Sequence, residues 1–98
     1  MIAYTPGASR QVDDFIHYYD DRQRPEAIRA LLTAMDEAEG KIEHAPSAGL
    51  KAPRPYPRLR QRGRAWVKAG RYWFAYSTTA PPVIVGVFFE TANIPGRL

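Results

Sequence analysis

The chain has 98 residues, of which 45% are hydrophobic, and a formal net charge of +4 at pH 7. This length predicts a single compact domain over residues 1–98, because a second hydrophobic core would lack material. The chain contains no cysteine, which excludes disulfides, thiolate zinc sites and cysteine nucleophiles.

The charge is divided unevenly along the chain. Residues 1–44 carry nine acidic and five basic side chains, whereas residues 45–98 carry nine basic side chains and a single acid, Glu90. Eight of the basic side chains lie in residues 50–76, which contain no acid. Such a segment indicates a polyanionic partner: nucleic acid, an acidic protein segment, or both.

The sequence shows no sign of export or membrane insertion. The first residues lack the basic start and the apolar run of about 7–15 residues that a signal peptide needs. The longest apolar stretch, residues 81–89, is far shorter than the roughly 18 residues of a membrane span. We therefore expect a cytoplasmic protein with no membrane contact.

The first predicted elements are a short strand and a helix. Residues 1–5 form a brief apolar run, and Pro6 and Gly7 follow it as a turn pair. Ser9 is then placed to cap a helix that ends near Arg22, because apolar side chains follow it at helical spacing.

A second helix is predicted from Pro25 to Ala45. Proline in the first turn of a helix costs no hydrogen bond, and Pro46 makes an extension beyond Ala45 unfavourable. Because only a few residues separate the two helices, they are expected to fold back on each other as an antiparallel hairpin.

Three strands are predicted after a proline-rich loop. Residues 47–61 contain Pro53, Pro55 and Pro57 and are expected to run extended over the surface. The strands cover residues 64–69, 72–79 and 83–90 and form an antiparallel meander. The last strand is apolar on both faces, so it is expected to be central.

Together these elements predict an α+β fold. A short N-terminal strand and a C-terminal three-stranded antiparallel meander form a small twisted sheet, and the helical hairpin packs on one face of it. The opposite face is expected to be open or covered by a partner. Because side chains alternate along a strand, Tyr72, Phe74 and Tyr76 share one face, and Trp73 is expected on the exposed one.

Residues for ordinary enzyme chemistry are sparse. The two histidines, His17 and His44, lie in the predicted helices, where a structural role is favoured. The sequence has no carboxylate pair at a hydrolytic spacing, no cluster of metal ligands and no phosphate-binding glycine loop. We therefore expect no metal and no cofactor.

Basic and aromatic side chains combine in the first strand of the meander. Arg64, Trp66 and Lys68 alternate along one face, and Trp73 follows in the next strand. Guanidinium groups pair with phosphates and flat rings stack on unpaired bases, so this pattern is typical of an RNA surface. The alternative is that the arginines are solvated and the tryptophans belong to the core.

Four features in this order carry a family resemblance. They are the helical hairpin whose second helix begins at Pro25, and the stretches HAPSAGL, RLRQRGRAWVKAGRYWFAYS and VIVGVFFETANIPGRL. Over nearly the whole chain they resemble the RelE/ParE superfamily of toxins from bacterial type II toxin–antitoxin modules. The resemblance implies a compact α+β toxin that forms a hetero-oligomer with a cognate antitoxin and is neutralised by it.

Two activities divide this superfamily. RelE-like members cut messenger RNA on the ribosome, and ParE-like members inhibit DNA gyrase. RelE-like toxins place an arginine where this chain has Trp73, and basic and tyrosine side chains where it has residues 89–93. The chain therefore resembles the ParE side more closely, which implies growth inhibition by binding an essential target such as gyrase, without chemistry of its own.

Two alternatives stay open. The first alternative to a ParE-like toxin is a RelE-like ribosome-dependent endoribonuclease, with Arg64, Arg71 and Tyr76 as candidate catalytic residues. The second is a non-toxic member that binds its antitoxin and regulates transcription with it. The residues predicted to bind the antitoxin or the target are Arg58, Arg60, Arg62, Arg64, Trp66, Lys68, Trp73 and Arg97.

Overall fold

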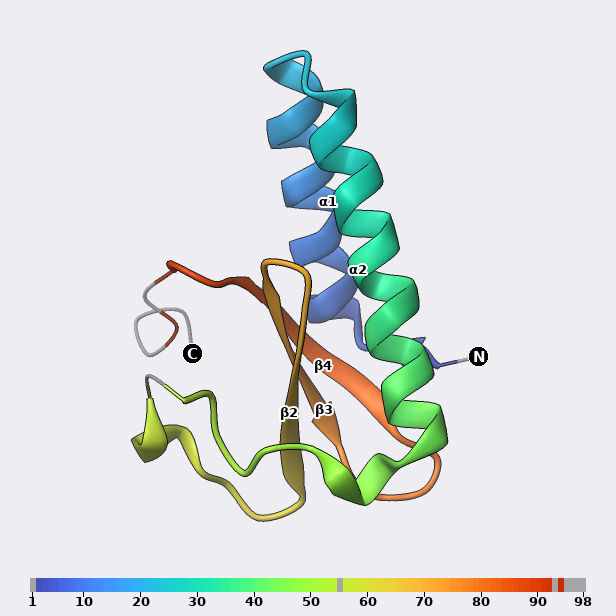
Figure 1. Ribbon diagram of the computed structural model, residues 1–98, viewed down its shortest axis with the longest axis vertical. Coiled ribbons are helices and arrows are strands. Elements are labelled where there is room, and N and C mark those ends of the chain that lie inside the picture. The colour runs from blue at the N-terminus through green and yellow to red at the C-terminus, as the bar shows by residue number, and fades with distance from the viewer. Residues whose placement is uncertain (1, 55, 93, 95–98) are drawn as a thin grey trace.

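The computed structural model describes residues 2–54, 56–92 and 94, and it has the predicted α+β fold. Along the chain the elements are β1 (Ala3–Tyr4), α1 (Pro6–Asp21), α2 (Pro25–His44), the 3-10 turns η1 (Pro46–Ala48) and η2 (Pro57–Leu59), β2 (Arg64–Ala69), β3 (Tyr72–Ser77) and β4 (Val83–Phe89). The predicted fold class is therefore confirmed (Figure 1).

The four strands form one sheet in the order β1-β4-β3-β2. Strands β2, β3 and β4 are an antiparallel meander, and β1 pairs in parallel with β4. Strand β4 therefore lies between two neighbours, as its apolar faces predicted. Gly70 has a φ of +55° in the tight turn that joins β2 to β3, a conformation that glycine adopts without steric cost.

Helix α1 begins earlier than the sequence predicted. The side chain of Thr5, and not that of Ser9, caps the helix by accepting a hydrogen bond of 3.2 Å from the backbone N–H of Ala8. Pro6 occupies the first helical turn, where its missing N–H leaves no carbonyl unpaired. The prediction that Pro6 and Gly7 form a turn before the helix was therefore wrong.

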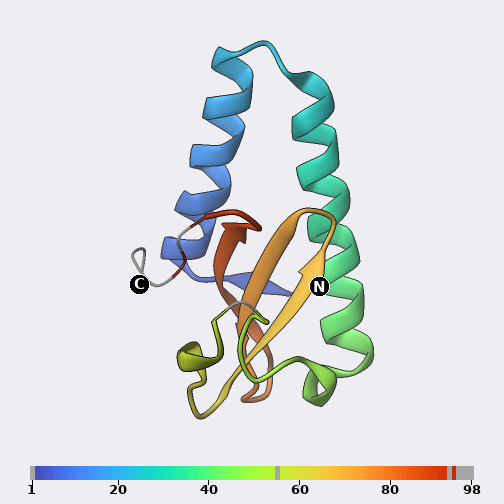
Figure 2. The ribbon, with the colours of Figure 1, turned by 60° about the vertical axis from the view of Figure 1, so that its left-hand side comes forward.

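The two helices form the predicted antiparallel hairpin, and α2 begins at Pro25 as expected. Gln23 has a φ of +53° in the short connection between them. Figures 1 and 2 show that the closed end of this hairpin stands clear of the strands, while its other half covers one face of the sheet. The hairpin is thus longer than the sheet that it packs on.

The main core lies between the helices and the sheet. Leu31 and Ile42 of α2 pack there against Phe74 and Tyr76 of β3, and each of these four side chains is at most 1% exposed. The phenol of Tyr76 donates a hydrogen bond of 2.7 Å to the carbonyl of Pro46, which ties β3 to the segment after α2.

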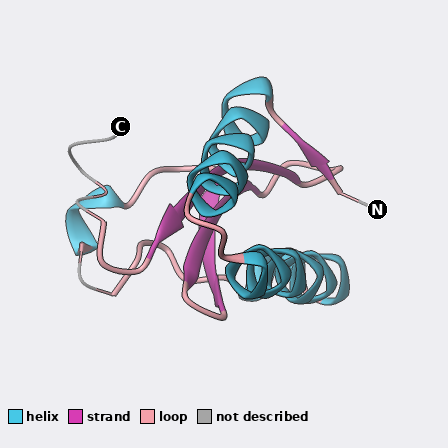
Figure 3. Cartoon of the chain, turned by 90° about the horizontal axis from the view of Figure 1, so that it is seen from above, coloured by secondary structure: helices cyan, strands magenta, loops and turns pink. Residues whose placement is uncertain are grey.

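The opposite face of the sheet is covered by the chain itself. Trp66, Trp73 and Phe88 form a second buried cluster with Ile94, and the loop residues Tyr56 and Leu59 pack against it. In Figure 3 the strands lie between α2 on one side and η2 on the other. The expectation of an open face with Trp73 exposed was therefore wrong, since Trp66 is 0% and Trp73 4% exposed.

The outer edge of β2 is also occupied by the chain. The backbone of Leu50 exchanges two hydrogen bonds of 2.8 Å with Trp66 in the middle of the strand. Gln61 accepts from the Arg64 N–H at 3.2 Å, and the ammonium of Lys41 donates to the Lys68 carbonyl at 3.1 Å. This edge is therefore closed to pairing with another chain.

Candidate partner-binding surfaces

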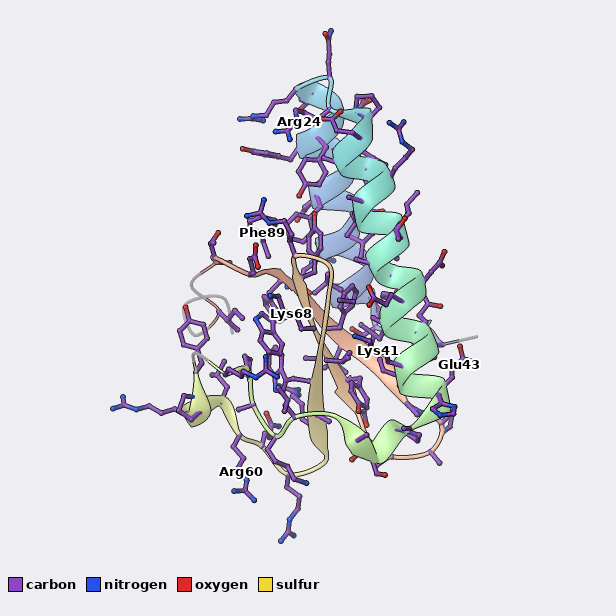
Figure 4. The ribbon with its side chains drawn as sticks, viewed as in Figure 1. Arg24, Lys41, Glu43, Arg60, Lys68 and Phe89 are labelled. Atoms are coloured by element: carbon purple, nitrogen blue, oxygen red, sulfur yellow. The ribbon has the colours of Figure 1, made fainter. Side chains whose placement is uncertain are left out.

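A groove of about 800 Å³ lies where the free half of the helical hairpin meets the end of the sheet, and we call it the end groove. It is lined by α1, α2, the β2–β3 turn, the end of β4 and the two residues Thr91 and Ala92. In Figure 4, Arg24 marks its helical end and Phe89 its sheet end.

Aromatic side chains dominate the end groove. Phe15 and Phe89 both meet the ring of Tyr72 edge to face, with ring centroids 5.3 and 5.4 Å apart. The hydroxyls of Tyr19 and Tyr72 hydrogen-bond to each other. Tyr18 is 52% exposed, with the guanidinium of Arg22 above its ring. Tyr72 is buried, and Phe15, Tyr19 and Phe89 are half-buried. A partner that filled the groove would therefore cover chiefly Tyr18 and the outer parts of the half-buried rings.

The end groove also contains one strand-edge N–H, that of Phe89, and the carbonyl of this residue already accepts from the Ala92 N–H at 3.0 Å. Strand β1 is two residues long and covers only the start of β4, and the side chain of Gln11 accepts from the Val87 N–H at 2.9 Å. Because the Glu90 N–H bonds to the Arg71 carbonyl, the Phe89 N–H points away from β3. Among the described residues this N–H has no acceptor, so a polypeptide segment could pair with it.

Three charged side chains form a cluster beside the end groove. The carboxylate of Glu90 accepts from Arg71 at 2.5 Å and pairs with the ammonium of Lys68 at 3.1 Å. The hydrogen bond from Arg71, and then that from Lys68, hold the pKa of Glu90 below its ordinary value. Two of the predicted site cations thereby share one carboxylate, and the three side chains together keep a net charge of +1.

A second, basic hollow of about 470 Å³ lies at the other end of β2, and we call it the basic cup. Figure 4 shows Arg60 pointing outward at this end of the molecule, away from Phe89. Lysine and arginine side chains line the cup together with small and polar residues: Lys51, Arg60, Arg62, Arg64, Ser47, Gly49, Gln61, Gly63, Ala65 and Thr78.

The candidate catalytic residues do not converge. Arg64 pairs with Ser77 at one end of the β2–β3 ladder, and Arg71 lies in the turn at the other end, about 17 Å away at roughly 3.4 Å per residue. Tyr76 is 1% exposed on the helix face, whereas Arg64 projects from the opposite face. Burial also raises the pKa of Tyr76, so the phenol keeps its proton and less of the phenolate that a general base requires is present at neutral pH.

The residues predicted to bind a partner are divided between several places. Arg60, Arg62 and Arg64 share the basic cup, while Arg58 is exposed on η2 outside it. Lys68 pairs with Glu90. The tryptophans Trp66 and Trp73 are buried, and Arg97 lies outside the described residues.

Sequence reasoning missed the end groove. Phe15, Tyr18 and Tyr19 stand at positions i, i+3 and i+4 of α1 and therefore share one helix face. The two helices are longer than the strands of six and seven residues, so the sheet cannot cover the whole of this aromatic stripe. Aromatic side chains on a helix face that the sheet cannot cover were the sequence signal for a partner-binding surface.

No family model matches the chain, and no curated protein matches it in sequence.

Among residues 2–54, 56–92 and 94 there is no group of three or more histidine, cysteine or acidic side chains placed to hold a metal ion. Within the same residues no helix has the length and apolar character to cross a membrane.

Proposed function

We propose that the protein is the toxin of a type II toxin–antitoxin module, similar to the ParE side of the RelE/ParE superfamily. Support comes from the fold, which has the element order, the helical hairpin and the meander that the resemblance implies. Since many functions share one fold, this support is an analogy, and the site carries the proposal further.

The observation that carries the proposal is the end groove. It combines aromatic side chains with the Phe89 N–H, which has no acceptor in the part of the chain that the structure describes, and the two features together suit an extended polypeptide. A nucleic acid would meet Asp14 and Glu26 in the lining, and these carboxylates disfavour a phosphate backbone there. The antitoxin segment lies in this groove, where it covers the aromatic surface and silences the toxin.

The toxin acts by binding and not by cleavage. The three residues that a ribonuclease would need lie on different faces and ends of the sheet, so they cannot act on one phosphate together. Inhibition of an essential protein such as DNA gyrase requires only a complementary surface, and the uncompensated cations at the basic end speed such an encounter.

Growth of a bacterial host tests this proposal. Induction of the chain alone is expected to arrest growth, and co-expression of the protein encoded next to it is expected to restore growth. If the arrest results from gyrase inhibition, the cells are expected to show DNA-damage signalling while their transcripts stay intact. Arrest with new transcript 5′ ends would instead indicate the ribonuclease, and normal growth on induction would indicate a non-toxic co-regulator.

A further inference from the structure

The cations of the basic cup are not compensated by acids. Lys51, Arg60 and Arg62 are exposed and Arg64 is half-buried, and none of the four pairs with a carboxylate among residues 2–54, 56–92 and 94. The acid of the C-terminal half, Glu90, is held by Lys68 and Arg71 at the far end of the strand. The cup is thus a local concentration of positive charge.

The rest of the lining is small and polar. Ser47, Gly49, Gly63 and Thr78 offer little apolar area, and Ala65 is the one hydrophobic residue in the wall. Protein partners are bound through aromatic and apolar patch centres with polar rims, whereas interfaces with nucleic acid are more polar and much more positively charged. The chemistry of the cup therefore favours nucleic acid over an acidic peptide.

The cup also lacks an aromatic ring. On the face of the sheet from which Arg64 projects, Trp66 and Trp73 are buried under Tyr56, Leu59 and Ile94. Single strands are bound largely by stacking bases on exposed rings, which this surface does not provide. The guanidinium groups of the cup can pair with phosphates. Contacts to phosphates do not distinguish one base sequence from another.

We propose that the basic cup binds the phosphate backbone of a nucleic-acid duplex without reading its bases. Small residues let a backbone approach closely, and Arg60, Arg62, Arg64 and Lys51 each neutralise phosphate charge. This function is separate from the end groove at the opposite end of β2. It does not depend on the toxin proposal, because binding to a duplex requires neither growth arrest nor an antitoxin.

Fluorescence anisotropy of a labelled DNA duplex of about 20 base pairs tests the proposal. The affinity of the chain for the duplex is measured at salt concentrations between about 50 and 200 mM. The chain is made by cell-free translation, so that toxicity does not interfere. Wild type is expected to bind two unrelated sequences equally well. The variant Arg60→Ala/Arg62→Ala is expected to bind at least about tenfold more weakly at the lowest salt. Its salt slope, the slope of log K against log salt concentration, is expected to be shallower by about 2 because two phosphate contacts are lost.

The matched control is Arg10→Ala/Arg29→Ala. Both arginines are exposed on the helices, so this variant loses the same net charge outside the cup. It is expected to retain the wild-type salt slope. Equal weakening of both variants, tighter binding of the single strand than of the duplex, or binding to a polyglutamate peptide in place of DNA would each overturn the proposal. Circular dichroism of both variants checks that they remain folded.

Discussion

Replacing Trp66 by alanine is expected to lower the free energy of unfolding by about 3–5 kcal/mol. The indole is 0% exposed, lies 5.8 Å from the ring of Phe88 and packs with Ile94, so its removal leaves a large cavity. A domain of this size has a total stability of about 5–15 kcal/mol, so the loss is a large fraction of it. Urea unfolding followed by circular dichroism measures the change.

Two further variants sharpen this test. Tyr18→Ala removes a ring that is 52% exposed and is expected to change stability by less than about 1 kcal/mol. Trp66→Phe keeps a ring but removes the buried indole N–H, which has no acceptor among the described residues, so it is expected to cost less than Trp66→Ala. A Trp66→Ala protein as stable as wild type would mean that the sheet face is open.

Gly49→Ala is expected to destabilise the protein by about 1–3 kcal/mol. A methyl group at this position would lie 2.9 Å from Cβ of Ala65 and 3.0 Å from the phenol ring of Tyr76. The backbone of Gly49, with φ −64° and ψ 158°, accepts any residue, so the cost comes from crowding and not from conformation. The same urea unfolding experiment measures the effect.

Gly40→Ala is the matched control. This glycine lies inside α2, and a Cβ there would meet nothing within 4 Å. Alanine is therefore expected to raise the free energy of unfolding by up to about 1 kcal/mol, because it has the higher helix propensity. If Gly49→Ala stabilised the protein as Gly40→Ala does, the close contact between the η1 segment and Tyr76 would be contradicted.

The element order could be predicted from the sequence because its signals are local. Pro25 begins α2, Gly70 turns β2 into β3, and strand alternation placed Tyr72, Phe74 and Tyr76 on one face. The start of α1 was missed because Pro6 suits both a turn and a first helical turn. The hydrogen bonds from the Ala8 N–H to the Thr5 side chain and from the Ser9 N–H to the Thr5 carbonyl show that the helix already begins at Pro6.

The position of each site depended on contacts between distant segments, which local patterns do not report. The alternating prolines predicted an extended surface loop, but nothing local indicated that Tyr56 and Leu59 would cover Trp66 and Trp73. The basic stretch was visible as a run of charge. The β2–β3 register places Arg64 and Arg71 at opposite ends of the two strands. The basic side chains are therefore divided between the basic cup and the ion pairs of Glu90.

Amide hydrogen exchange of Phe89 tests most directly whether a polypeptide partner lies in the end groove. The exchange rates are measured by nuclear magnetic resonance on the isotope-labelled chain, free and bound to the protein encoded next to it. The Phe89 amide is predicted to exchange at least about tenfold more slowly in the complex, while amides at Arg62 and Gly63 of the basic cup keep their rates. An unchanged Phe89 rate with new protection at Arg62 and Gly63 would contradict the account and place the partner at the basic cup.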